Sequence, residues 1–159
     1  MRLIPVIAAL CVVVAAQAFA QNPSTHDFVT KVAISDMFEI QSSKLATKKG
    51  DAETKSFAQT MIKDHTKTSG ELKKLVAKLK VKLPTELDAD HKKKIDELTK
   101  LDGDKFDDAY DRMQVQAHQE AVKLFTAYSK NGDDADLKAW ASKTLPALEH
   151  HLQMAKKLK

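Results

Sequence analysis

The sequence predicts an all-α protein. Apolar residues recur along the chain at spacings of three and four, which is the period of a helix that buries one face. Patterns typical of β-strands are nearly absent, and the glycines and prolines fall mainly where helices are expected to break. The length of 159 residues is enough for one domain with a substantial core. We therefore expect a single helical bundle.

The first long helix is expected to begin near Ser24 or Thr25, either of which can cap a helix N-terminus, and to run to about Lys48. Gly50 follows at the position that a helix C-terminus favours. The second long helix should begin after Asp51 and run to about residue 80. Gly70 lies inside it at a cost of about 1 kcal/mol relative to alanine, so we expect another helix to pack closely there.

A break is predicted at residues 83–86, which include Pro84. A short, highly charged helix should follow at residues 88–101, with a narrow apolar edge formed by Ile95, Leu98 and Leu101. The third long helix is expected at residues 105–130 and the fourth at 134–157, separated by a turn at 131–134. Pro146 lies inside the fourth helix and is expected to kink it.

Two helical hairpins follow from the tight turns at Gly50 and Gly132. The connection from about residue 79 to 105 is long enough to carry the chain back along the bundle. Two hairpins joined by one long crossover form the ferritin-like arrangement. The sequence thus predicts a ferritin-like four-helix bundle with a short extra helix in the long crossover between helices 2 and 3. An up-down-up-down bundle with a fifth helix packed outside is the alternative.

Residues 1–20 have the features of a signal peptide that is cleaved after Ala20. Arg2 supplies a positive start, an apolar run follows, and Ala18-Phe19-Ala20 is a cleavage signal with small residues. An uncleaved membrane anchor is the alternative, although the run is short for a span. The only cysteine, Cys11, lies inside this run, and Leu10 before it argues against lipidation. We expect residues 21–26 to form a short N-terminal tail and 27–158 to form the bundle.

Processing would leave a periplasmic or secreted protein with no transmembrane segment and no cysteine. Loss of Arg2 lowers the basic count from 26 to 25, against 22 acidic residues, so the formal net charge falls from +4 to +3. The lysines alternate with acids, and no aromatic residues lie among them to stack on bases. We therefore expect no nucleic-acid binding. A homodimer and an unidentified protein partner are both left open.

Each of the four long helices carries an ionisable residue where the helical period calls for an apolar side chain. These residues are Glu39, His65, His118 and His151. Counted in residues from the turn at Gly50, Glu39 and His65 differ in position along the bundle axis by roughly 6 Å. Counted from Gly132, His118 and His151 differ by roughly 8 Å. The four side chains could therefore meet in the bundle core.

Imidazole nitrogens with one carboxylate suit a transition metal such as zinc, copper or iron. We predict a metal site formed by these four side chains, and Asp64, Asp107 and Tyr110 could orient the rings or serve as alternate ligands. The alternative is a metal-free buried polar network, which would titrate between about pH 5 and 8. Such a network would suit a non-enzymatic envelope interaction or stress-protection module.

Several catalytic classes have no support in the sequence. The di-iron site of ferritins needs two Glu-x-x-His motifs, and none occurs here. No cysteine remains after processing, no serine lies in a nucleophile elbow, and glycine-rich phosphate loops are absent. A redox enzyme using a bound metal would also need a substrate pocket, of which the sequence shows no sign. We therefore predict no catalytic residues.

Several motifs together resemble the DUF4142 family of exported bacterial proteins. They are Asp64-His65, Phe106-Asp107-x-Ala109-Tyr110, His118 and Leu145-Pro146-x-x-x-x-His151-Leu152. The resemblance extends from about Asp27 to Leu158. It implies a signal peptide, a location in the Gram-negative cell envelope and a ferritin-like bundle, and it implies no established activity.

Overall fold

Within residues 23–158, the range that the computed structural model describes, the protein contains five α-helices and no β-strand. The helices are α1 (Thr25–Lys49), α2 (Ala52–Val76), α3 (Ala89–Thr99), α4 (Asp104–Asn131) and α5 (Ala135–Ala155). The predicted all-α class is therefore confirmed. The predicted signal peptide and the first two residues of the predicted tail lie outside the described range. None of the described helices is both long enough and apolar enough to span a membrane.

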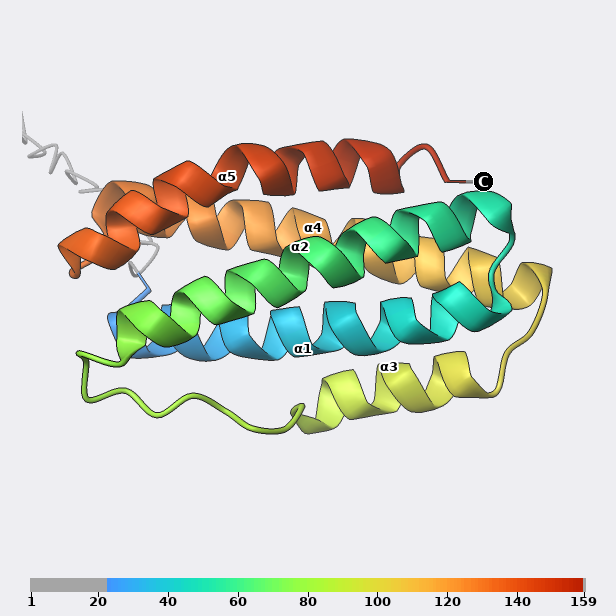
Figure 1. Cartoon of the computed structure of the whole chain (residues 1–159), viewed down its shortest axis with the longest axis horizontal. Helices are drawn as coiled ribbons and strands as arrows, with labels where there is room; N and C mark the ends of the chain where they lie inside the picture. Colours follow the sequence, from blue (N-terminus) through green and yellow to red (C-terminus); the bar gives the residue numbers. More distant parts are fainter. Residues whose placement is uncertain (1–22, 159) are drawn as a thin grey trace, which may run out of the picture.

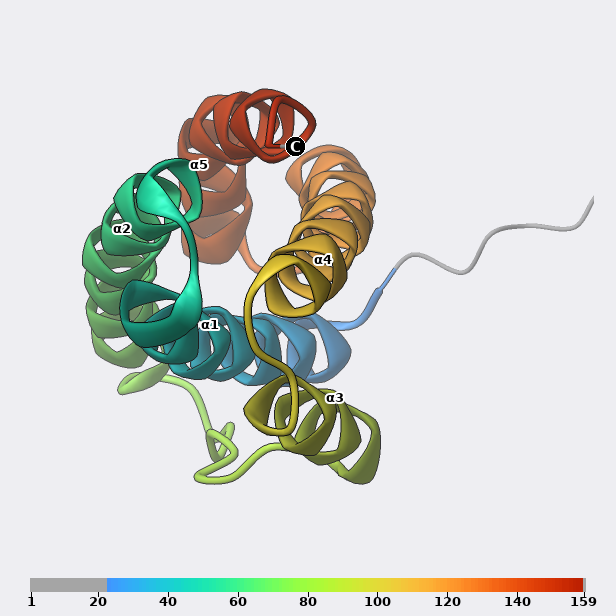
Figure 2. The same ribbon diagram turned by 90° about the vertical axis from the view of Figure 1, so that its right-hand side faces the viewer.

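The four long helices form two antiparallel hairpins, α1 with α2 and α4 with α5 (Figure 1). The end-on view in Figure 2 shows these four helices around a common interior, in the order α1, α2, α5, α4, while α3 lies outside against α1 and α4. The segment that contains α3 returns the chain to the other end of the molecule. As a result α2 and α4 run in the same direction (Figure 1).

Polar side chains cap the N-termini of three of the four long helices, α1, α2 and α5. The Ser24 hydroxyl accepts a hydrogen bond from the backbone N–H of Asp27, and the Asp51 carboxylate accepts one from Thr54. Asp134 caps α5 in the same way. Such caps each stabilise a helix by about 0.5–2 kcal/mol. They place the two chain reversals and thereby fix the relative heights of the helices within each hairpin.

Helix α2 ends at Val76, four residues before the predicted end at Lys80. Residues 77–80 form turns in which the Leu79 N–H donates to the Val76 carbonyl at 2.9 Å. The apolar period that led to the longer prediction continues through Leu79, which packs against the core from this turn. An apolar side chain can thus keep its place in the core after the helix has ended.

The apolar core is divided into two clusters along the bundle. One contains Phe28, Phe125, Tyr128 and Trp140, and the other contains residues such as Phe57 and Tyr110. Each long helix contributes apolar residues to both clusters, and between these two groups of residues it carries at least one buried polar residue. The buried polar residues are Glu39, His65, Gln114, His118 and His151. The core is therefore apolar at both ends and polar in the middle.

The expectation of close helix packing at Gly70 is wrong. Gly70 is exposed, and a Cβ atom built on it would have no neighbour within 4 Å. The glycine therefore weakens α2 by its backbone freedom without allowing a closer contact.

Replacement of Gly70 by alanine should stabilise the protein. We expect the free energy of unfolding to rise by up to about 1 kcal/mol, because alanine loses less backbone entropy in a helix. Urea unfolding followed by circular dichroism measures this change. Gly103→Ala serves as the contrast, since Gly103 has a φ of 56° and should tolerate a side chain poorly. An equal or lower stability of Gly70→Ala would contradict the expectation.

Candidate metal centre

Three buried histidines from three helices meet in the polar middle of the core. His65 lies on α2, His118 on α4 and His151 on α5, with 4%, 1% and 4% of their surfaces exposed. Their ring centroids lie 5.5 to 5.7 Å apart. Each ring offers one nitrogen, and the three nitrogens lie within 4.8 Å of one another. We refer to His65, His118 and His151 as the histidine triad.

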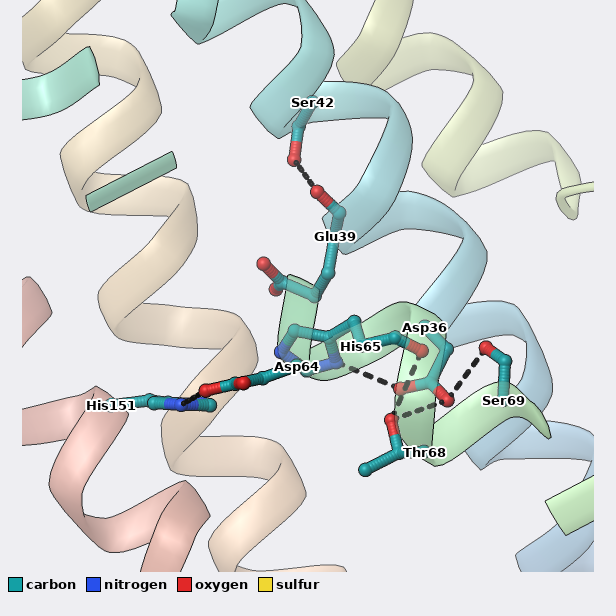
Figure 3. A network of polar contacts seen from close by, with 8 residues as sticks. All are labelled: Asp36, Glu39, Ser42, Asp64, His65, Thr68, Ser69 and His151. Atoms are coloured by element: carbon teal, nitrogen blue, oxygen red, sulfur yellow. Dashed lines mark hydrogen bonds and ion pairs between the residues drawn. The ribbon is translucent and has the colours of Figure 1, made fainter. Parts of the chain in front are cut away.

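The His65 ring is held by a carboxylate on the neighbouring helix. Its Nδ1 lies 2.8 Å from Asp36 Oδ1, and Asp36 is itself buried on α1. The hydroxyls of Thr68 and Ser69 each donate to Asp36 Oδ2 at 3.0 Å, as Figure 3 shows. Because a carboxylate can only accept here, the proton lies on Nδ1 of His65. In the neutral ring, Nε2 then carries a lone pair, and this atom is buried without a partner.

The other two rings are oriented by the same principle. His118 Nδ1 donates to the backbone carbonyl of Gln114 at 2.9 Å, which leaves Nε2 buried and without a partner. His151 Nε2 donates to Asp64 Oδ2 at 3.0 Å (Figure 3), which leaves its Nδ1 buried and without a partner. Each ring of the triad therefore has one nitrogen fixed by an acceptor and one nitrogen free. This is the pattern of histidines that ligate a metal, since the outer acceptor sets the tautomer and the ring orientation.

Burial keeps two of the rings uncharged. Removal from water, together with the nearby charge of His65, lowers the pKa of His118 from 6.5 to about 4. Burial, together with the nearby charges of His65 and His118, also lowers the pKa of His151 to about 4. Burial lowers the pKa of His65 as well, but the hydrogen bond and the charge of Asp36 outweigh it and leave this pKa raised. At neutral pH the triad thus presents at least two unprotonated rings, the form that binds metals.

Glu39 lies beside His65 and outside the group of three nitrogens. Its carboxylate is buried and has no hydrogen-bond partner, and Figure 3 shows its side chain on the same side of α1 as His65. Burial raises its pKa to about 7, although the charge of His65 opposes this. Among the described residues, the ligand atoms that lie within 4.8 Å of one another belong to His65, His118 and His151, and Glu39 is not one of this group. The structure therefore brings together three of the four predicted ligands and places the fourth next to them.

Asp107 and Tyr110 are not adjacent to the triad. Asp107 accepts a hydrogen bond from the backbone N–H of Asp51 at the α1–α2 turn, and the Tyr110 hydroxyl is paired with Ser43 at 2.8 Å. At 1.5 Å per residue, these two positions are about 16 and 12 Å from His118 along α4. Their hydrogen bonds connect the helices at one end of the bundle.

Two residues that hold the polar layer together were missed by sequence reasoning, Asp36 and Gln114. Asp36 lies three residues before Glu39, so both share the inward face of α1, and this spacing was the available signal. The Gln114 side chain donates to the Ser42 hydroxyl at 3.3 Å, and its backbone carbonyl holds His118. A backbone acceptor leaves no mark in a sequence, which explains the omission.

The spacing of the triad is close to what a small metal ion requires. Ligands at about 2.0–2.1 Å from a tetrahedral ion would lie roughly 3.4 Å apart, against an upper limit of 4.8 Å between the nitrogens here. Small ring movements would close this difference. The buried nitrogens, with their unshared lone pairs and outer acceptors, fit a transition metal by position and by chemistry.

Fold and site together define an all-helical protein with a buried cluster of three histidines able to hold a metal. The chain belongs to the DUF4142 family, described as a domain of unknown function, whose model matches residues 12–158. The solved structure of "CopM in the Cu(II)-bound form" has a similar fold, with a TM-score of 0.70 at 18% sequence identity. The similarity covers 84% of this chain and 94% of that one. No curated protein matches the sequence significantly.

The depressed pKa of His118 predicts a pH-dependent stability. Above pH 6.5 the His118 ring is neutral in both the folded and the unfolded chain, and its contribution to the free energy of unfolding is complete. As the pH falls from 6.5 towards 4, the unfolded chain binds a proton that the folded protein does not, and this contribution is lost. We expect the stability difference between the wild type and His118→Gln to shrink by up to about 3 kcal/mol over this range. Urea unfolding with a chelator present measures it. His150→Gln, an exposed neighbour of the triad, is the control; similar behaviour of both variants would contradict the prediction.

Proposed function

We propose that this protein is an exported, ferritin-like helical bundle that binds a transition metal through His65, His118 and His151. The observation that carries the proposal is the set of three buried ring nitrogens without hydrogen-bond partners. An unpaired buried polar atom costs about 1–3 kcal/mol, so three of them in one place are unfavourable unless something binds there. A metal ion would accept all three lone pairs at once. Glu39 is the candidate for a fourth ligand after a side-chain rotation.

Copper(II) is the ion that we favour. Three imidazoles suit copper, zinc and iron, and copper(II) heads the affinity order of the divalent first-row metals. The structurally similar CopM is described in a Cu(II)-bound form, which supports the same choice without identifying the ion. Zinc is the second candidate, because a tetrahedral site of three imidazoles and one further ligand is common for it.

The metal-free polar network has less support. Such a network would be expected to pair its members with one another, as Asp36 and His65 do. Three histidine nitrogens and both Glu39 oxygens have no such partner. A role in envelope interaction or stress protection remains compatible with metal binding, since a bound ion would also stabilise the bundle.

The ferritin-like topology has its own support. Neighbouring long helices run antiparallel, and the segment containing α3 crosses the length of the bundle between the two hairpins (Figures 1 and 2). This is the arrangement that one long crossover produces. Export rests on the features of residues 1–20, and N-terminal sequencing of the protein recovered from the periplasm tests it. A first residue other than Gln21 would reject cleavage after Ala20.

Isothermal titration of the metal-free protein with copper(II), zinc(II) and iron(II) tests the metal site. We expect one ion per chain, and at an ion concentration of 100 times the Kd the stability should rise by about 2.7 kcal/mol. His65→Ala, His118→Ala and His151→Ala should each abolish both effects. His150→Ala is the matched control, because it removes an exposed ring next to His151. Absence of binding by the wild type, or an equal loss in His150→Ala, would reject the proposal.

The carboxylate behind His65 should tune the affinity. Asp36→Asn keeps the size of the side chain but removes the charge that holds the Nδ1 proton, so the ring becomes a weaker and less fixed ligand. We expect metal affinity to fall about 10- to 100-fold. The same titration measures this, with the exposed Asp90→Asn on α3 as control. An unchanged affinity in Asp36→Asn would show that the outer acceptor does not matter.

A further inference from the structure

A cavity of about 580 Å³ lies between α1 and α4 and extends from the surface to His65 of the histidine triad. Its inner end is formed by Asp36 and His65, and residues of all five helices contribute to its lining. The volume lies within the roughly 300–1,000 Å³ of small-molecule sites. Neither the metal hypothesis nor the family match accounts for a space of this size.

The walls of the cavity are mainly apolar. Val32 and Ile34 line it from α1, Ala121 and Leu124 from α4, and Leu148 from α5. Val32 and Leu148 are buried in the core, whereas Ala121 and Leu124 are half-buried. An apolar body of small cross-section would replace water along these walls, which is favourable by about 25 cal/mol for each Å² removed from water.

Three lysines line the outer part of the cavity. Lys31 on α1 and Lys123 on α4 are exposed, and Lys94 on α3 is half-buried, with its ammonium 5.7 Å from the Phe38 ring. None of the three forms an ion pair with another residue in the range 23–158. Three cationic side chains from three helices thus contribute to the lining of one cavity.

The acidic residues of the lining are already engaged. Asp88 is hydrogen-bonded to His91, and Glu120 accepts a hydrogen bond from Gln116. At the inner end, both oxygens of Asp36 are used by His65, Thr68 and Ser69. Asp88 and Glu120 keep their negative charges, but neither forms an ion pair with Lys31, Lys94 or Lys123 among residues 23–158. An anionic group therefore has unpaired cations to meet in this lining.

We propose that this cavity binds a small amphiphilic carboxylate, such as a medium-chain fatty acid. The carboxylate lies at the mouth among Lys31, Lys94 and Lys123, and the apolar chain lies along the walls towards the bundle interior. The proposal does not depend on a bound metal, because the apolar walls and the lysines lie outside the histidine triad.

Titration calorimetry with decanoate, in the presence of a chelator, tests the proposal. Decanol and decyltrimethylammonium serve as neutral and cationic ligands with the same chain. We expect decanoate to bind at least tenfold more tightly than either. In Lys31→Glu/Lys123→Glu the decanoate affinity should fall at least tenfold while decanol binding stays unchanged, because only the carboxylate meets the lysines. Lys63→Glu, an exposed α2 lysine outside the cavity lining, is the matched control.

A second variant tests the apolar walls. Ala121→Trp fills the cavity between α1 and α4 and should abolish binding of both decanoate and decanol, and its circular dichroism spectrum shows whether the fold is kept. Should that variant fail to fold, Ala121→Leu provides a smaller obstruction with the same expected direction. Equal binding of the three ligands, or decanoate binding that survives both the charge reversal and the wall variants, would overturn the proposal.

The metal site and the carboxylate site can fail separately. His118→Ala should lose metal binding yet keep decanoate, since His118 does not line the cavity. Conversely, Lys31→Glu/Lys123→Glu should keep metal binding. Metal binding without decanoate binding by the wild type would reject only the cavity proposal, and the reverse result would reject only the metal site.

Discussion

The burial of three imidazole rings in the middle of a helical core is the constraint on which the rest of the structure depends. Each ring must have a partner for at least one nitrogen, and the partners come from α1, α2 and α4. These hydrogen bonds form only when each helix has a particular position along the bundle axis and a particular rotation about its own axis. The apolar clusters on either side supply the packing energy that makes this demanding arrangement possible.

Much of the fold could be predicted because its boundaries are marked by local chemistry. Asp51 and Asp134 cap helices through their own side chains, and such signals are visible in the sequence. The end of α2 was harder, because Leu79 continues the apolar period from within a turn. Gly70 was misjudged for a related reason. A glycine inside a helix is compatible with close packing or with an empty surface, and only the neighbouring elements decide between them.

The candidate site could be predicted in part. The helical period was enough to select three rings that the structure brings together, because a polar residue on an apolar stripe must face the interior. The exact set of neighbours was beyond the sequence. Asp107 and Tyr110 share the inward face of α4 with His118, yet their distance along the helix axis directs them to other partners. The role of Asp36 depends on the packing of α1 against α2, which no local pattern encodes.

The distribution of the triad between the hairpins has a consequence for folding. His65 belongs to the hairpin of α1 and α2, whereas His118 and His151 belong to that of α4 and α5. Contacts within a hairpin join residues closer in sequence than contacts between the hairpins, so we expect each hairpin to form before the two pack together. The three rings would then come together late in folding. A ligand that binds all three rings would connect the α1–α2 hairpin to the α4–α5 hairpin. It would slow the separation of the two hairpins and the access of proteases to the interior.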